Sequence, residues 1–334
     1  MITLLIPSLR LANQTDQPLF DPTAELALPG LTSLLGRGHH SKNEQIGAEQ
    51  WLRQQFQAVG VSAAALTLML DFPTAQEGYW LRADPVHLRA DRDRALLFDA
   101  SALALQQQEA DQLVASLNHL YADDGFRFMA ATPSRWYVRL PRAMDCMTTP
   151  LAEVLGRDIR PCLPSGPMAL NWHRFLNEVQ MLLYNQAVND EREARGSLAA
   201  NSVWLWGEGR APEGLVKPTH QLYANDALAR GMALASGVAH ADLPQQYSVD
   251  LVSDSFIVLD SLVAAAVQGD IYTWRDKLMQ LEIQWFQPIL QAWRQGQLGS
   301  IRLVLFGDQG TITVVLNPAD RWKFWRTPLA LAQV

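Results

Sequence analysis

Short apolar runs alternate with segments of helical periodicity along this chain, and this alternation constrains the fold more than any other feature. Residues 2–6 form an apolar run that Pro7 follows, which predicts a buried first strand. Residues 255–259 have the same character, whereas residues 226–236 carry helical spacing and are closed by Gly237. Chains that alternate in this way fold as layers of helices on a mostly parallel sheet. The expected fold class is therefore α/β.

The last two apolar runs, residues 301–306 and 311–316, indicate a different local arrangement. They flank the tetrapeptide Gly-Asp-Gln-Gly at 307–310, and a short connection of this kind between two apolar runs is typical of a β-hairpin. We expect the hairpin to add an antiparallel edge to a mostly parallel sheet that is sandwiched by helices.

Three further segments give local predictions. Residues 66–72 are apolar and predict a strand. Ser41 and Glu44 have the S-x-x-E spacing of a capping box, which predicts the start of a helix. Residues 171–189 place their apolar side chains on one face, which predicts a single helix packed on a core.

Breaks in the pattern predict a second domain inside the first. From Tyr79 onward the chain changes to short strands around a charged loop, and residues 141–167 contain five prolines and little periodicity. We expect a core domain from residues 1–75 and 201–334, and an inserted smaller α/β domain from residues 76–200.

Composition excludes several classes of protein. A chain of 334 residues with 49% hydrophobic and 18% charged residues is globular and large enough for two domains. The net charge of −7 argues against a broad nucleic-acid surface. Cys146 and Cys162 form no C-x-x-C pair, so neither a disulfide framework nor a structural zinc site is indicated. Without a basic leader or a long apolar stretch, a cytoplasmic location is expected.

Residues 185–210, which read NQAVNDEREARGSLAANSVWLWGEGR, concentrate the chemistry-bearing side chains. The helix should run to about Asn189, with Gly196 as a natural stop residue beyond it, and the β-prone run 202–206 is followed by Gly207 and Gly209. A strand that ends in a glycine turn places backbone N–H groups and a guanidinium at the edge of a sheet, where ligands commonly bind. The predicted ligand-binding set, at the domain junction, is Asn185, Arg192, Arg195, Asn201, Trp204, Trp206 and Arg210.

An alternative without a ligand stays open for this segment. Arg192 and Arg195 can pair with Glu191 and Glu193 on a solvated turn, while the two tryptophans pack in the core or at an interface. In the ligand-binding interpretation each arginine donates two hydrogen bonds from its guanidinium to a phosphate or a carboxylate. The expected ligand is therefore a small phosphorylated or carboxylate compound.

Residues 320–326, which read DRWKFWR, suggest a protein partner. Three aromatic rings among basic residues near a terminus can anchor another protein. The favoured alternative is that these rings pack back onto the core.

The segment 185–209 has the pattern N-x-x-x-N-x-x-R-x-x-R-G-x-x-x-x-N-S-x-W-L-W-G-x-G and resembles the corresponding segment of archaeal-type cofactor-independent phosphoglycerate mutases, members of the alkaline phosphatase superfamily. Residues 79–88, 109–124 and 223–238 are similar to other parts of that family. The chain is also similar to a bacterial group of RpfE-type regulatory proteins. The resemblance implies an alkaline-phosphatase-like sheet sandwiched by helices, with an inserted smaller α/β domain.

The resemblance also implies a site with two divalent metals, held by Asp and His side chains beside a Ser or Thr nucleophile. In this chain Pro7, Ser8 and Leu9 follow the first strand, where the family has a metal-binding aspartate. Residues 260–270 and 307–310 correspond to further ligand positions, and both lack the family's histidines. No catalytic residue and no metal site is therefore predicted.

Asp260, Asp270 and Asp308 are weak candidates for an oxygen-only site that holds one ion. Each also suits a helix cap or a turn, and Asp308 lies where a hairpin turn favours aspartate. We expect no cofactor, with manganese or magnesium as the alternative.

Fold and chemistry thus disagree, and function has to be argued from the site. We expect a degenerate mutase-like protein, a pseudoenzyme without catalysis, that acts in ligand binding or regulation. One alternative is an active metal-dependent phosphoglycerate mutase or phosphatase with rearranged ligands. The other is a structural protein-interaction module. Neither nucleic acid nor a membrane is an expected partner.

Overall fold

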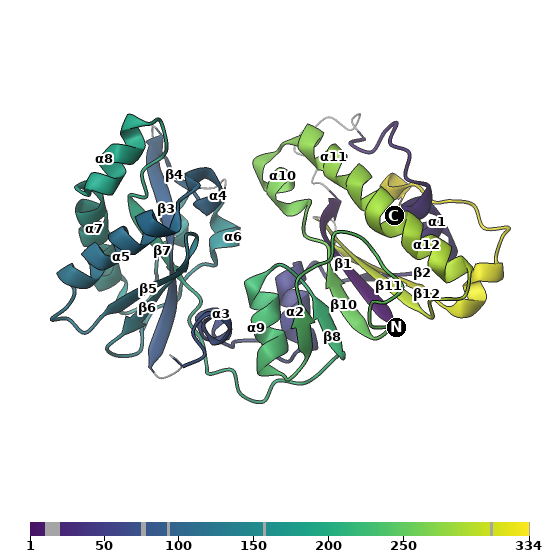
Figure 1. Ribbon diagram of the computed structural model, residues 1–334, viewed down its shortest axis with the longest axis horizontal. Coiled ribbons are helices and arrows are strands. Elements are labelled where there is room, and N and C mark those ends of the chain that lie inside the picture. The colour runs from purple at the N-terminus through teal and green to yellow at the C-terminus, as the bar shows by residue number, and fades with distance from the viewer. Residues whose placement is uncertain (11–20, 75–77, 92–93, 156–157, 308–309, 334) are drawn as a thin grey trace. The chain divides into compact units, whose positions relative to one another are not determined.

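The computed structural model describes residues 1–10, 21–74, 78–91, 94–155, 158–307 and 310–333 (Figure 1). The chain divides into two compact units. Unit 1 contains Met1–Val59 and Gly214–Val334, and unit 2 contains Gly60–Glu213, so unit 2 is inserted into unit 1 in sequence. None of the helices in the described ranges is long and apolar enough to cross a membrane.

Unit 1 is built on a mixed sheet with seven strands among the described residues. Strands β11, β1, β10, β8 and β9 run parallel to one another. β12 pairs antiparallel with β11, so both the mostly parallel sheet and the terminal hairpin are confirmed. In sheet order the strands are β2 (His39–Asn43), β12 (Thr311–Leu316), β11 (Ile301–Gly307), β1 (Ile2–Arg10), β10 (Ser255–Val258), β8 (Gln221–Tyr223) and β9 (Ala239–Ala241).

Helices cover both faces of this sheet, because neighbouring strand residues point to opposite sides. Phe256 packs on Trp51 and Phe56, with ring centroids 5.4 and 6.3 Å apart. Its neighbour Ile257 belongs to the core cluster on the other face, together with Leu31 and Trp293. The helices are α1 (Pro29–Arg37), α2 (Ala48–Gln55), α9 (Ala227–Ala235), α10 (Val263–Gln268), α11 (Ile271–Leu281) and α12 (Gln287–Arg294), with a π-helical turn at Glu282–Phe286 and 3-10 turns at Pro318–Trp322 and Leu331–Gln333.

Unit 2 contains a separate antiparallel sheet with five strands among the described residues. Its long strand β3 (Tyr79–Asp91) pairs with β4 (Arg94–Phe98), β6 (Arg135–Leu140) and β7 (Ser202–Trp206), and β5 (Arg127–Thr132) pairs with β6. Apolar side chains of α5 and α7 pack against this sheet. The helices are α3 (Ala63–Asp71), α4 (Ala100–Leu103), α5 (Gln107–Leu120), α6 (Leu151–Val154), α7 (Ala169–Tyr184) and α8 (Ala187–Ala194), with a 3-10 turn at Arg160–Cys162.

The predicted strand at residues 66–72 is wrong, because these residues lie in helix α3. The Oγ atom of Ser62 caps this helix by accepting from Ala65 N at 3.0 Å. α3 buries residues on several sides, so its sequence shows neither a helical nor a strand period. A short apolar run of this kind does not distinguish the two structures.

The predicted capping box at Ser41 and Glu44 is also wrong. Ser41 lies in the edge strand β2, where it pairs with Thr313 of β12. The helix begins only at Ala48, after Gly47. Pairing with a partner distant in sequence outweighs the local helix signal here.

Two element boundaries differ from expectation. The single helix predicted for residues 171–189 is two helices, because α7 ends with Asn185 as its C-cap and α8 begins at Ala187. Strand β1 continues past Pro7 to Arg10, with a shift of register against β11.

Candidate functional site

Arg192 of α8, at the centre of the predicted ligand-binding set, is completely buried in unit 2. Its Nη1 donates to Oε2 of Glu109 at 2.6 Å, and its Nε donates to the carbonyl of Leu198 at 2.9 Å. Nη2 donates to the carbonyl of Leu103. All three nitrogens of the guanidinium therefore bind acceptors of the same unit.

Glu109, in the first turn of α5, binds both arginines of the motif. Arg195 Nη2 donates to its second carboxylate oxygen, and the backbone N–H of Gln106 donates to Oε2 at 2.9 Å. Burial acts to raise the pKa of Glu109, but Gln106 and the two guanidiniums outweigh it and lower the pKa. The structure thus gives the arginines an ion-pair partner that the sequence did not reveal, in place of Glu191 and Glu193.

The asparagines of the motif bind backbone groups. Asn189, which the predicted set omitted, is buried and holds Leu183 and Ala200 through three hydrogen bonds of 2.7 to 3.1 Å. Asn201 accepts from Leu88 N at 2.8 Å and donates to Leu88 O at 3.0 Å. Asn185 is exposed and donates to Met181 O.

The two tryptophans of β7 lie in different surroundings. Trp204 is buried, and its indole N–H donates to Thr149 O at 2.8 Å. Trp206 is half-buried and donates to the Asp84 carboxylate at 2.7 Å. Arg210 is exposed and donates to Glu213 O. Among the described residues, the hydrogen bonds of Glu109 and its two arginines do not extend to these tryptophans.

Sequence reasoning missed a buried ion pair beside Trp206. Arg82 donates to both carboxylate oxygens of Asp84, the shorter distance being 2.7 Å, and its guanidinium lies 5.1 Å from the Trp206 ring centroid. The backbone N–H of Trp136 also donates to Asp84. A signal was present, because Arg82 and Asp84 are two residues apart on one strand and so share a face.

A second carboxylate continues this polar network. Asp71 accepts from Tyr137 Oη at 2.6 Å and from Arg135 at 2.6 and 2.7 Å. Burial raises the pKa of Tyr137, which keeps the phenol protonated as the donor to Asp71. Arg82 lies over the same ring at 5.5 Å. The groups satisfy one another, as a scaffold network requires.

In unit 1 two aspartates follow neighbouring parallel strands, at the carboxyl edge where ligands of α/β sheets commonly bind. Asp226 follows β8 and caps α9, accepting from Ala229 N at 2.7 Å. Asp260 follows β10, and its pKa is raised by burial and by the charge of Asp226. Ser8 of β1 has a φ of 55°, and its carbonyl accepts from the Trp274 indole at 2.9 Å.

The weak metal candidates do not assemble into the site that the resemblance implies. Asp270 caps α11, and its hydrogen bond from Thr273 lowers its pKa. Asp308 lies outside the described residues. In the described part of the chain, no three His, Cys, Asp or Glu side chains gather in a group that could hold a metal ion. The described donors therefore do not fit a two-metal centre.

The aromatic side chains of the C-terminal segment point into solvent. Trp322, Phe324 and Trp325 are 71%, 80% and 68% exposed. The favoured expectation that these rings pack back onto the core is wrong. Large exposed rings next to one another are typical of a binding surface.

Residues 68–189 match the family model described as 2,3-bisphosphoglycerate-independent phosphoglycerate mutase. The chain is a distant homologue of these mutases. The match covers most of unit 2, including α5, α7 and the start of α8. The archaeal-type resemblance is thus supported at the level of distant homology, while the RpfE-type grouping stays a prediction.

Two curated relatives illustrate the distance. The probable mutase of this type from Geobacter sulfurreducens is 29% identical over 133 residues, which is 39% of this chain and 33% of the relative. The mutase from Methanosarcina mazei is 27% identical over 144 residues, which is 42% of this chain and 36% of the relative. The aligned part therefore spans about a third of each relative.

Two solved structures are similar over most of the chain. The PH0037 protein from Pyrococcus horikoshii has a TM-score of 0.52 at 12% identity and covers 94% of this chain and 87% of its own. The cofactor-independent phosphoglycerate mutase from Thermoplasma acidophilum has a TM-score of 0.45 at 16% identity, with 94% and 88% covered. At 12% identity, the similarity to the PH0037 protein shows only that the two proteins share a fold.

Proposed function

We propose that this chain is a mutase-like protein that lacks two-metal phosphoryl transfer and acts by binding a ligand in a regulatory role. The observation that carries the proposal is how the acids at the carboxyl edge of the parallel sheet are used. Asp226 and Asp270 accept backbone N–H groups as helix caps, and in the described part of the chain Asp260 belongs to no group of three His, Cys, Asp or Glu side chains that could hold a metal ion.

The arginines of the motif differ in whether they can contact a ligand. In a phosphate-binding site they would offer free N–H groups, whereas Arg192 is enclosed and has three acceptors within unit 2. Of the predicted set, Arg195 and Arg210 are the exposed cations. These two guanidiniums are the candidates for contacting a ligand, and a small phosphorylated or carboxylate compound remains the proposed ligand.

A mutase assay tests the proposal. The purified full chain, analysed for bound metal, is incubated with manganese and 3-phosphoglycerate, and the formation of 2-phosphoglycerate is followed beside an active mutase as positive control. We expect no turnover above the blank. Turnover proportional to the protein concentration and abolished by Asp260→Asn would refute the proposal and restore an active enzyme with rearranged ligands.

A second candidate function is protein interaction, and the exposed rings of Trp322 and Phe324 favour it. Truncation at Pro318 is a poor test, because it also removes Leu331, which is buried in the core of unit 1. The double variant Trp322→Ser/Phe324→Ser leaves the core intact. Loss of a defined partner from an affinity capture, with unchanged circular dichroism, supports interaction, while an unchanged set of captured proteins contradicts it.

A further inference from the structure

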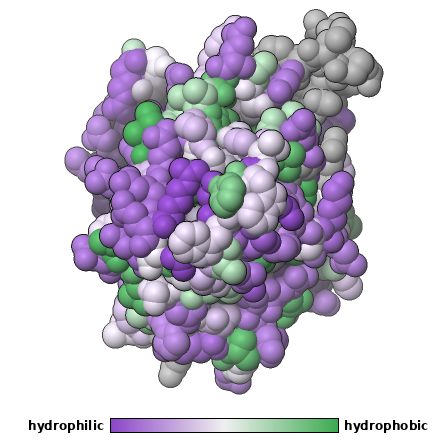
Figure 2. Space-filling model, turned by 90° about the vertical axis from the view of Figure 1, so that its right-hand side faces the viewer, coloured by the Kyte–Doolittle hydropathy of each residue, from purple (hydrophilic) through white to green (hydrophobic). Residues whose placement is uncertain are grey.

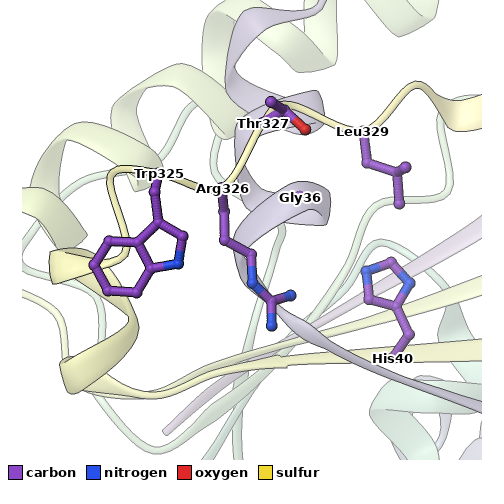
Figure 3. Close-up of a pocket in the computed structure, with 6 residues that line it drawn as sticks. All are labelled: Gly36, His40, Trp325, Arg326, Thr327 and Leu329. Atoms are coloured by element: carbon purple, nitrogen blue, oxygen red, sulfur yellow. The ribbon is translucent and has the colours of Figure 1, made fainter.

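A pocket of about 460 Å³ opens on unit 1, beside the C-terminal segment. Its walls come from the end of α1, from β2 and from the segment that follows the Pro318–Trp322 turn. Figure 3 shows the Arg326 side chain reaching into the space between Trp325 and His40. The lining residues are Gly36, His40, Trp325, Arg326, Thr327 and Leu329.

The wall of this pocket is held firmly against α1. Leu329 N donates to Thr32 O at 3.0 Å. A Cβ atom at Gly36 would lie 2.2 Å from Thr327 O, so only glycine allows the segment to pack this closely. The backbone that carries Trp325 and Arg326 is therefore anchored immediately beyond these two residues.

The polar groups in the pocket lack partners of the opposite charge. Within the described part of the chain, Arg326 has only a backbone hydrogen bond, to Lys323 O, and its guanidinium pairs with no carboxylate. His40 Nε2 lies 2.7 Å from Leu35 O, which is an acceptor, so Nε2 carries the proton. Among the described residues, the Nδ1 atom of His40 has no hydrogen-bond partner.

Positive charge accumulates around the pocket, although the chain as a whole carries −7. Arg37 follows the lining residue Gly36, and burial together with the charge of Arg294 lowers its pKa. The buried Asp320 is already shared by Lys323 at 2.5 Å and His39 at 3.4 Å. Excess charge of one sign in a concave site attracts an ion of the other sign.

The surroundings combine this charge with an aromatic surface. Figure 2 turns toward the viewer the side of unit 1 on which the C-terminal segment lies, and pale and green residues are scattered there among the hydrophilic ones. The Trp325 ring forms one wall of the pocket and is 68% exposed. The indole ring offers a flat face for stacking, and the neighbouring guanidinium can donate two hydrogen bonds to one anion.

We propose that this pocket binds a small organic anion, in which a carboxylate or a phosphate is attached to a flat ring. Arg326 takes the anionic group in a bidentate arrangement, and Trp325 stacks on the ring. The volume is within the range of about 300–1,000 Å³ that small-molecule pockets occupy. This site lies entirely within unit 1 and does not depend on the motif at residues 185–210.

The test uses three probes of matched shape: phenyl phosphate, benzoate and the neutral phenol. Indole N–H signals of the full-length protein are recorded in two-dimensional NMR spectra, with the Trp325 signal assigned through Trp325→Phe. We expect one or both anions to shift this signal in a saturable manner, and phenol at the same concentration to leave it in place. A response to phenyl phosphate alone identifies phosphorylated ligands, and a response to benzoate alone identifies carboxylates.

Matched variants connect the response to the pocket. Arg326→Gln removes the guanidinium and is expected to weaken binding of the anion about tenfold or more, since a hydrogen bond to a charged group is lost. Arg174→Gln removes an exposed arginine from α7 of unit 2, and Trp322→Ala removes an exposed indole outside the pocket; both should bind like the wild type.

Arg326 and Trp325 are exposed, so their substitution leaves the core untouched, and circular dichroism verifies the fold. The proposal is overturned if neither anion shifts the Trp325 signal, if phenol shifts it equally, or if Arg326→Gln binds as tightly as Arg174→Gln.

Discussion

Arg192 is enclosed by unit 2 and donates its Nη1 to the Glu109 carboxylate at 2.6 Å. The contact ties α8 to the first turn of α5, 83 residues away in sequence. The arginine of the mutase-like motif therefore holds two helices together, and this position dictates how its substitution should be tested.

Arg192→Met should destabilise the protein by about 3–5 kcal/mol, because it removes the buried cation that pairs with Glu109 and leaves the carbonyls of Leu103 and Leu198 without this donor. The free energy of unfolding, measured in urea, checks this. Arg195→Met is the matched control. Its side chain is 48% exposed, so its pair with Glu109 should contribute about 1 kcal/mol or less. Equal losses for the two variants would contradict a structural role specific to Arg192.

Arg195→Ala tests the predicted ligand site without disturbing the fold. If the exposed guanidinium binds an anion, saturating 3-phosphoglycerate should raise the Tm of the wild type, since a ligand at about 100 times its Kd adds about 2.7 kcal/mol. The variant should lose this rise and keep the Tm of the ligand-free protein to within a few degrees. An unchanged rise would remove Arg195 from the site.

Glu282→Ala should destabilise unit 1 by roughly 2–4 kcal/mol. The Glu282 carboxylate is fully buried and accepts from Gly30 N at 2.6 Å and from Leu31 N at 3.0 Å, so truncation leaves two buried donors unsatisfied. Glu282→Gln keeps one oxygen for these donors and should lose less. A glutamine variant as unstable as the alanine variant would show that charge, and not the cap, is what matters.

Asp260→Asn should stabilise the protein at pH 7. Burial and Asp226 raise the pKa of Asp260, so its folded-state carboxyl favours the proton more than the unfolded one, whose pKa is about 3.9. The favourable contribution is complete below that unfolded pKa and is lost as the pH rises through the folded pKa. Unfolding free energies at pH 7 and pH 3.5 should therefore show a gain from Asp260→Asn only at the higher pH. A gain that is equal at both values would contradict this.

Local patterns predicted much of the fold because they report on one element at a time. The helix α9 lies between an Asp226 cap and Gly237, and the final hairpin spans two apolar runs, as the spacing indicated. Sequence periodicity did not predict the helix α3, because this helix is buried on several sides. The capping pattern at Ser41 gave a wrong helix start, because Ser41 pairs with a strand that is distant in sequence. In both cases tertiary packing outweighed propensity.

The sequence by itself determined the class of fold, the order of its main elements and the segment richest in chemistry-bearing side chains. Only the tertiary structure decided what those side chains contact. Arg192 meets Glu109 across 83 residues, and Trp206 meets Asp84 across 122. The exposure of the rings at Trp322 and Trp325 likewise depended on how the last segment packs against α1. Periodicity describes the face of one element, whereas a hydrogen-bond partner is selected by the folding of the whole chain, so no local pattern contains it.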